Sequence, residues 1–173
     1  MAKIILVGYM GVGKTSVGYD LSQKTLIPFF DLDDLIVQQT KLSISEIFEQ
    51  KGEIWFRKTE HLVLKNFLNT NEHFILGLGG GTPCYGNNHL FLKEENISSI
   101  YLKASIPTII ANLSSELDSR PILKSIKTDL PSFIGPHLFE RSYFYNFAKH
   151  KISVDKKSID EISTEIINLL KLA

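Results

Sequence analysis

The chain has 173 residues, of which 43% are hydrophobic and 22% are charged, and its 19 basic residues balance its 19 acidic residues. This length and composition are typical of one globular domain and exclude an intrinsically disordered chain. The zero net charge provides no overall positive field for nucleic acid or anionic lipid. No apolar run approaches the roughly 20 residues of a membrane-spanning helix. We therefore expect one soluble domain over residues 1–173, with no nucleic-acid or membrane partner.

Cysteine usage and the first residues bear on the compartment. Cys84 is the single cysteine, so an internal disulfide is impossible. The chain also enters a strand-like run at once, with no segment resembling a secretion signal. We expect a cytoplasmic protein and, in the absence of any pattern that indicates an oligomer, a monomer.

Short apolar runs alternate with helical patterns along the chain. Strands are predicted at residues 4–7, 28–32, 74–78, 100–102 and 152–154. Helices are predicted at about 13–24 and 54–68, and two more begin at residue 35 and at the capping-box spacing of residues 43–46. The stretch 114–132 fits neither period, and we predict a long loop that serves as a mobile lid at about 114–130. This alternation predicts a three-layer α/β/α fold with a five-stranded parallel sheet and ligands at the carboxyl ends of its strands.

The first predicted turn carries a phosphate-binding motif. Gly8-Tyr9-Met10-Gly11-Val12-Gly13-Lys14-Thr15 follows a strand and opens a helix, which is the context of a true phosphate loop. Its backbone N–H groups and the helix N-terminus attract phosphate, Lys14 adds a charge, and the Thr15 hydroxyl suits Mg²⁺. The ATP-binding residues expected here are Gly11, Val12, Gly13, Lys14, Thr15 and Ser16. The motif predicts a nucleoside triphosphate with Mg²⁺ as cofactor.

Other features favour a small kinase over a switch or a motor. The guanine-reading Asn-Lys-x-Asp motif of regulatory GTPases is absent, and the strand through Leu76 ends in Gly79-Gly80-Gly81 instead of the acid typical of motor ATPases. The nearest acid at a strand end is Asp31. We therefore expect a second substrate, not water, to accept the phosphoryl group.

Two acids flank Leu32 at the end of the second predicted strand. One of Asp31 and Asp33 is suited to serve magnesium through its water shell, and the other to hold a hydroxyl of the acceptor. The alternative is that Asp31, Asp33 and Asp34 only cap the next helix and favour its dipole.

Arginine is scarce, since all but three of the 19 basic residues are lysine. Arg57, Arg120 and Arg141 are therefore candidates for forked recognition of carboxylate or phosphate, which lysine cannot provide. The alternative is three ordinary surface ion pairs. A small hydroxylated carboxylate would satisfy Arg57 and Arg141 as clamps and Asp33 as hydroxyl partner. The glycines Gly79, Gly80 and Gly81 would present backbone N–H groups to it.

Taken together in chain order, these motifs resemble the shikimate kinase family across nearly the whole chain. The resemblance rests on the phosphate loop, Asp31-Leu32-Asp33, Ser45-Glu46-Ile47-Phe48 with Gly52-Glu53, Phe56-Arg57-x-x-Glu60, Gly79-Gly80-Gly81, Arg120-Pro121-Ile122 and Glu140-Arg141-x-x-x-Tyr145. It implies transfer of the ATP γ-phosphate to the 3-hydroxyl of shikimate, a step toward aromatic amino acids, with an acceptor-binding region at about 32–61.

The resemblance also implies individual roles. Lys14, Asp33 and Arg120 would be catalytic, and Arg120, descending on the lid, would also bind ATP. Asp31 and Thr15 would position Mg²⁺, and Glu60 would orient Arg57. The substrate-binding residues implied are Asp33, Arg57, Gly79, Gly80, Gly81 and Arg141, with Phe48 and Phe56 as candidate pocket walls.

The chain departs from the family pattern at two places. Leu113 stands where many relatives carry a basic residue near the adenine, and Thr82-Pro83-Cys84 after the glycines is less typical. Another small P-loop kinase, such as a gluconate or nucleoside monophosphate kinase, is the nearest alternative. A nucleotide sensor without turnover is an alternative of a different class.

Overall fold

A five-stranded parallel sheet forms the centre of the computed structural model, which describes residues 1–114 and 130–172. The strands are β1 (Lys3–Val7), β2 (Phe29–Asp31), β3 (Phe74–Gly77), β4 (Ser98–Lys103) and β5 (His150–Ser153), in the order β2-β3-β1-β4-β5. Every residue of β1 is buried, because β1 is the central strand and both faces of the sheet are covered. The predicted α/β fold with five parallel strands is confirmed.

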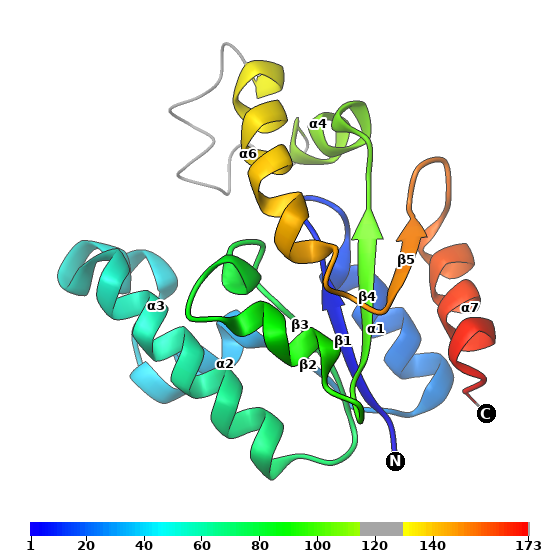
Figure 1. Ribbon diagram of the computed structural model, residues 1–173, viewed down its shortest axis with the longest axis horizontal. Helices are drawn as coiled ribbons and strands as arrows, with labels where there is room; N and C mark the ends of the chain where they lie inside the picture. Colours follow the sequence, from blue (N-terminus) through cyan, green and yellow to red (C-terminus); the bar gives the residue numbers. More distant parts are fainter. Residues whose placement is uncertain (115–129, 173) are drawn as a thin grey trace.

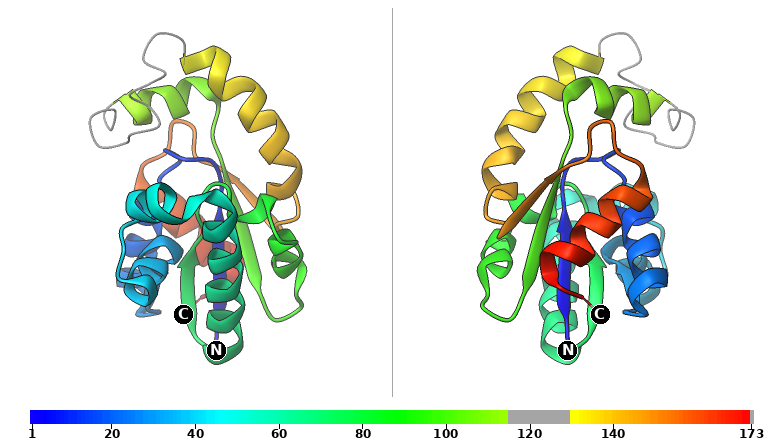
Figure 2. Two further views of the ribbon diagram at one scale, coloured as in Figure 1. Left: turned by 90° about the vertical axis from the view of Figure 1, so that its left-hand side faces the viewer. Right: turned by 90° about the vertical axis from the view of Figure 1, so that its right-hand side faces the viewer.

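Helices cover both faces of the sheet, as Figures 1 and 2 show. The helices are α1 (Lys14–Thr25), α2 (Leu32–Thr40), α3 (Ile44–Thr70), α4 (Ile106–Ser114), α6 (Leu130–Tyr145) and α7 (Ile159–Leu170), with the 3-10 helices η1 (Thr82–Cys84) and η2 (Asn88–Lys93). Helices α1 and α7 lie side by side on one face, and η2 with the second half of α3 lies on the other. Helices α4 and α6 lie beyond the carboxyl ends of the strands, at the end opposite both termini.

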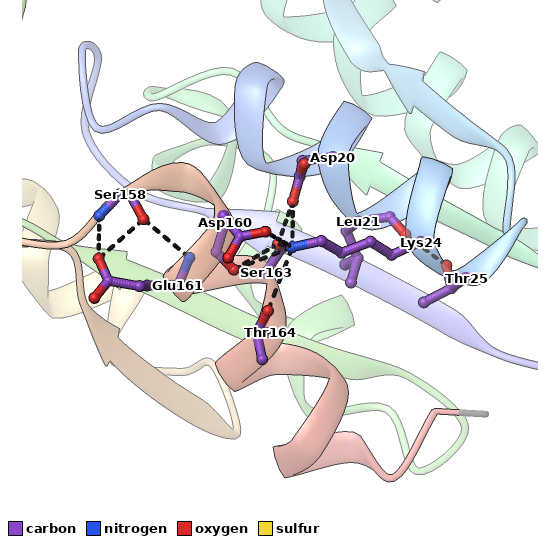
Figure 3. A network of polar contacts seen from close by, with 9 residues as sticks. All are labelled: Asp20, Leu21, Lys24, Thr25, Ser158, Asp160, Glu161, Ser163 and Thr164. Carbon is purple, nitrogen blue, oxygen red and sulfur yellow. Dashed lines mark hydrogen bonds and ion pairs between the residues drawn. The ribbon is translucent and has the colours of Figure 1, made fainter.

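A polar network at the surface, with Ser163 as its buried member, joins α1 to α7 (Figure 3). The Lys24 ammonium lies 2.8 Å from carboxylate oxygens of both Asp20 and Asp160 and donates to the Ser163 hydroxyl at 2.6 Å. Ser163, which is fully buried, also donates to Asp20. Because α1 begins at the last residues of the phosphate loop, this network holds the helix that presents the loop.

The structure differs from the sequence predictions at several boundaries. The two helices predicted at 43–48 and 54–68 form one element, α3, which is broken by non-helical dihedral angles at Gly52 (φ 79°, ψ 170°). Strand β2 ends at Asp31, and Leu32, which we placed in the strand, opens α2. The predicted loop 114–132 is wrong at its end, because α6 begins at Leu130. Residues 115–129, which include Arg120 and most of the predicted lid, lie outside the described residues.

Within the described ranges 1–114 and 130–172, no helix is both long and apolar enough to cross a membrane.

Candidate functional site

The phosphate loop connects β1 to α1 at the carboxyl edge of the sheet. Gly11 and Gly13 adopt positive φ angles of 79° and 91°, which are strained for other residues. A Cβ at Gly11 would lie 2.8 Å from Cδ2 of Leu113. Leu113, the departure noted in the sequence, is therefore a buried packing residue beneath the loop. Its neighbour Asn112 donates from Nδ2 to the Gly11 carbonyl at 2.7 Å.

The side chains of Lys14 and Thr15, at the start of α1, contact the loop backbone and Asp31 respectively. The Lys14 ammonium donates to the carbonyl oxygens of Gly8 and Tyr9 at 2.8 and 2.9 Å, so it is folded over the loop where phosphates would lie. The Thr15 hydroxyl donates to Oδ2 of Asp31 at 3.1 Å. Two oxygens suited to a hard cation therefore adjoin each other at the start of α1.

Asp31 has two structural roles at once. Its Oδ1 accepts the backbone N–H of Asp33 at 3.0 Å, which makes Asp31 the N-cap of α2. The capping alternative considered from the sequence is thus correct for Asp31. The same carboxylate nevertheless contacts Thr15 through its other oxygen, so capping does not exclude a place in the site.

A cavity of about 160 Å³ gathers most of the predicted site residues. Its lining consists of Met10, Gly11, Gly13, Lys14, Thr15, Ser16, Asp31, Asp33, Leu78, Gly79 and Gly80. Val12 is not among them, because its side chain is 3% exposed and belongs to the core. Only the backbone of Val12 is therefore placed to serve a ligand.

Asp33 lies at the wall of this cavity in an environment that disfavours a negative charge. Burial, together with the carboxylates of Asp31 and Glu60, raises the pKa of Asp33 to about 6, although the Lys14 ammonium opposes the shift. A carboxyl group with this pKa is ionised at neutral pH and still basic enough to accept a proton.

Arg57 is held at the edge of the glycine turn by several contacts. Its NH1 donates to Oε2 of the buried Glu60 at 2.9 Å, and its guanidinium carbon lies 4.2 Å from the centroid of the Tyr85 ring. A Cβ added to Gly81 would lie only 2.8 Å from NH2 of Arg57. The absence of a side chain at Gly81 therefore leaves the space that the guanidinium occupies.

Arg141 approaches the same turn from α6. A Cβ at Gly80 would lie 3.4 Å from NH1 of Arg141. One helical turn later, the hydroxyl of the fully buried Tyr145 donates to the Gly80 carbonyl at 2.6 Å. The two arginines that we predicted to clamp a carboxylate therefore border the glycine turn, and α6 is tied to that turn.

Sequence reasoning assigned no role to three residues near this turn. Thr82 is fully buried and donates to Glu60, Tyr85 stacks on Arg57, and Asn88 is fully buried beside Thr82. Thr82, Tyr85 and Asn88 belong to no recognised motif, and proximity to the glycines was the single signal for them. Cys84 is half-buried here, and burial raises the pKa of its thiol despite the nearby Arg57 and Arg141.

Phe48 and Phe56, the two candidate pocket walls, form a tilted ring pair with centroids 4.7 Å apart. Phe56 is 4% exposed and belongs to the core, whereas Phe48 is 38% exposed.

A second hollow, of about 640 Å³, lies along α3 beside Arg57 and is lined by Glu53, Ile54, Arg57, Lys58, His61, Leu62, Tyr85 and Gly86. Its lining is mainly apolar and contains neither Asp33 nor any phosphate-loop residue. We therefore place the candidate site in the smaller cavity and at the glycine turn.

Comparison with known proteins finds relatives that match nearly the whole chain. The family model described as shikimate kinase matches residues 10–171. The shikimate kinase of Flavobacterium johnsoniae is 49% identical over 98% of this chain and 99% of its own.

Solved structures give the same result. The shikimate kinase of Bacteroides thetaiotaomicron superposes with a TM-score of 0.89 at 28% identity and covers 99% of each chain. A structure of Acinetobacter baumannii shikimate kinase in complex with shikimate superposes with a TM-score of 0.87 at 29% identity, over 99% of this chain and 93% of that one. The chain therefore belongs to the shikimate kinase family.

Proposed function

We propose that the cavity at the carboxyl ends of β1, β2 and β3 is the site at which this member of the shikimate kinase family transfers the γ-phosphate of ATP to the 3-hydroxyl of shikimate. The observation that carries this assignment is the convergence of Asp33, Arg57 and Arg141 on one glycine turn opposite the phosphate loop. This arrangement suits a small acceptor that carries both a carboxylate and hydroxyl groups.

The donor half of the site holds ATP through the phosphate loop. The backbone N–H groups from Gly11 to Ser16 and the N-terminus of α1 surround the phosphates. Lys14 pairs with the β- and γ-phosphates, and its ammonium is placed for this because it lies over the loop beside the carbonyl oxygens of Gly8 and Tyr9.

Mg²⁺ fits the donor set at the start of α1. Thr15 and Asp31 offer a hydroxyl and a carboxylate oxygen, the ligand type that Mg²⁺ prefers, and ATP and water provide the rest. In our proposal Thr15 would hold the ion directly and Asp31 through water, and the ion would neutralise charge on the transferring phosphoryl group.

The acceptor half binds shikimate through charge and backbone contacts. Arg57 and Arg141 bind the carboxylate with their planar forks, and the N–H groups of the glycine turn, Gly79 to Gly81, contact the ring substituents. Asp33 accepts a hydrogen bond from the 3-hydroxyl and takes its proton as the oxygen attacks the γ-phosphorus. The bond from phosphorus to the bridging oxygen breaks, and the electron pair leaves with ADP.

The remaining parts of the proposal concern the whole chain. Arg120 lies outside the described residues, and by family resemblance it stabilises the transferring phosphoryl group from a lid at about 114–130. Residues 1–173 act as one kinase domain, as a monomer in the cytoplasm. A size and composition typical of one globular domain and a single cysteine support this part.

An acceptor screen with ATP and Mg²⁺ tests the proposal. Shikimate, gluconate and nucleoside monophosphates are compared by coupled ADP release, with a blank that lacks acceptor and a Lys14→Met variant as control. We expect acceptor-dependent release with shikimate alone, and phosphorus–proton NMR should place the phosphate on the 3-oxygen. Release with gluconate but not shikimate would assign another small-molecule kinase, and ATP binding without any turnover would favour a nucleotide sensor.

A further inference from the structure

A buried carboxylate links the arginine of the acceptor site to the turn after the glycines. Glu60 in α3 is 1% exposed, and each of its two oxygens has a donor. Oε2 accepts from NH1 of Arg57 at 2.9 Å, and Oε1 accepts from the hydroxyl of Thr82 at 2.6 Å. Thr82, the first residue of η1, is fully buried. Its hydroxyl is therefore a fixed donor to Glu60, shielded from water.

The backbone of Thr82 is held from two sides. Its N–H donates to the Gly79 carbonyl at 3.1 Å, and its own carbonyl accepts from Nδ2 of Asn88 at 2.9 Å. Asn88 is fully buried, and its Oδ1 accepts from Nδ1 of His61 at 2.7 Å. Since His61 follows Glu60 in α3, the network closes on the helix from which it starts.

We propose that Thr82 is a positioning residue for the acceptor site, and that it fixes the Arg57 guanidinium through Glu60. The inference rests on the proposed function, because Arg57 must bind the acceptor carboxylate for its position to matter. It gives a role to the segment Thr82-Pro83-Cys84, which the family resemblance left without one.

The orientation of the Glu60 carboxylate depends on its two hydrogen-bond donors, the Arg57 guanidinium and the Thr82 hydroxyl. With Thr82 in place, one oxygen is occupied and the other faces Arg57. Without the hydroxyl, Oε1 is a buried acceptor with no partner. This costs more free energy than the loss of a hydrogen bond at the surface, where water can replace the missing donor. The carboxylate then rotates or shifts to share Arg57 between its oxygens, and the guanidinium moves with it.

Space around Gly79 shows how closely these groups are arranged. A Cβ on Gly79 would lie 2.9 Å from the Thr82 hydroxyl oxygen, 3.5 Å from Oδ1 of Asp33 and 3.6 Å from Oε1 of Glu60. A shift of Glu60 thus occurs beside Asp33, whose pKa it raises. Thr82 therefore affects acceptor binding without touching ATP or the phosphate loop.

The test compares Thr82→Val, which keeps the shape and removes the hydroxyl, with Thr82→Ser, which keeps the hydroxyl. We expect Thr82→Val to raise KM for shikimate roughly tenfold, the usual effect of losing a hydrogen bond to a charged group. KM for ATP should stay within about twofold, and Thr82→Ser should recover most of the loss. Thr25→Val is the matched control, because the Thr25 hydroxyl bonds to backbone groups at the end of α1: it donates to the Leu21 carbonyl and accepts from the Ile27 N–H.

A double-mutant cycle with Glu60→Gln separates positioning from general stability. If Thr82 acts through Glu60, Thr82→Val should change KM for shikimate by less than about twofold in the Glu60→Gln background. A tenfold effect that persists there would overturn the proposal, as would a variant with lower thermal stability and unchanged KM. If the wild-type protein showed no turnover with shikimate, the proposed function would fail before this inference.

Discussion

Asp33 combines an unfavourable electrostatic environment with a proposed place in the chemistry, and replacing it should separate stability from activity. We expect Asp33→Asn to lower kcat by at least about a hundredfold, since the base is lost. The same change should stabilise the folded protein at neutral pH. Asparagine has nearly the same shape but carries no charge beside Asp31 and Glu60.

The magnitude follows from the raised pKa. In the folded protein the pKa of Asp33 is about 6, against 3.8 for an unperturbed aspartate. A carboxyl with a raised pKa binds more protons folded than unfolded, so its contribution to stability falls as the pH rises from about 4 to about 6. Two pKa units correspond to about 3 kcal/mol above pH 7. This is an upper limit, because Asp33 is partly exposed and water screens its neighbours.

Urea denaturation at two pH values measures the effect, with the fluorescence of Trp55, the single tryptophan, as the signal. Asp33→Asn should gain up to about 3 kcal/mol at pH 8 and about a third of that at pH 4.5. Asp34→Asn, at the exposed neighbouring position, is the control: Asp34 contributes least to the raised pKa of Asp33, so its replacement in the first turn of α2 should change the free energy of unfolding much less. An equal gain at both pH values, or a loss at pH 8, would refute the electrostatic argument.

Four further predictions follow from the same geometry. With Asp33 as the base, kcat/KM for shikimate should fall about tenfold per pH unit below about pH 6, and a flat profile down to pH 5 would count against this role. Arg57→Lys should raise KM for shikimate about ten- to a hundredfold and leave KM for ATP unchanged, because the planar fork is lost and the charge is kept; unchanged kinetics would argue against the clamp. Gly81→Ala should raise KM for shikimate more than it lowers thermal stability, since its Cβ would meet the Arg57 guanidinium at 2.8 Å; unaltered steady-state kinetics would contradict that contact. Ser158→Ala should reduce the free energy of unfolding by about 1 kcal/mol, because it removes the capping box of α7. It should leave kcat unchanged, because the Ser158 hydroxyl bonds to Glu161 and to no predicted site residue; a change in activity would mean that the start of α7, where Ile159 lies near Gly13, influences the phosphate loop.

Local patterns in the sequence were sufficient to predict the sheet and the loop between β1 and α1. The phosphate loop is one continuous segment between a strand and a helix, so its position and chemistry can be read from adjacent residues. The strands follow from short apolar runs, and their parallel arrangement follows from the helices between them. Boundaries were less accurate, as at β2, where the side chain of Asp31 caps α2 and ends the strand one residue early.

The acceptor half depends on contacts between distant segments, and only part of it was predictable. The scarcity of arginine indicated Arg57 and Arg141, but their approach to one glycine turn is decided by how α3 and α6 pack against it. The pKa of Asp33 depends on burial and on Glu60, which lies far along the chain. The hydrogen bond from Thr82 to Glu60 follows no local pattern, because both side chains are placed by the packing of η1 against α3.

By itself, then, the sequence determined a parallel α/β sheet, a phosphate loop at the edge of its strands, and the residue types suited to a hydroxylated carboxylate. The tertiary structure decided which of those residues meet, how Asp33 is charged, and that Thr82 supports Glu60. The physical reason is the separation along the chain of the residues that interact. Turn geometry and helix caps depend on neighbours in the chain, whereas burial, charge coupling and buried hydrogen bonds depend on segments that folding alone brings together.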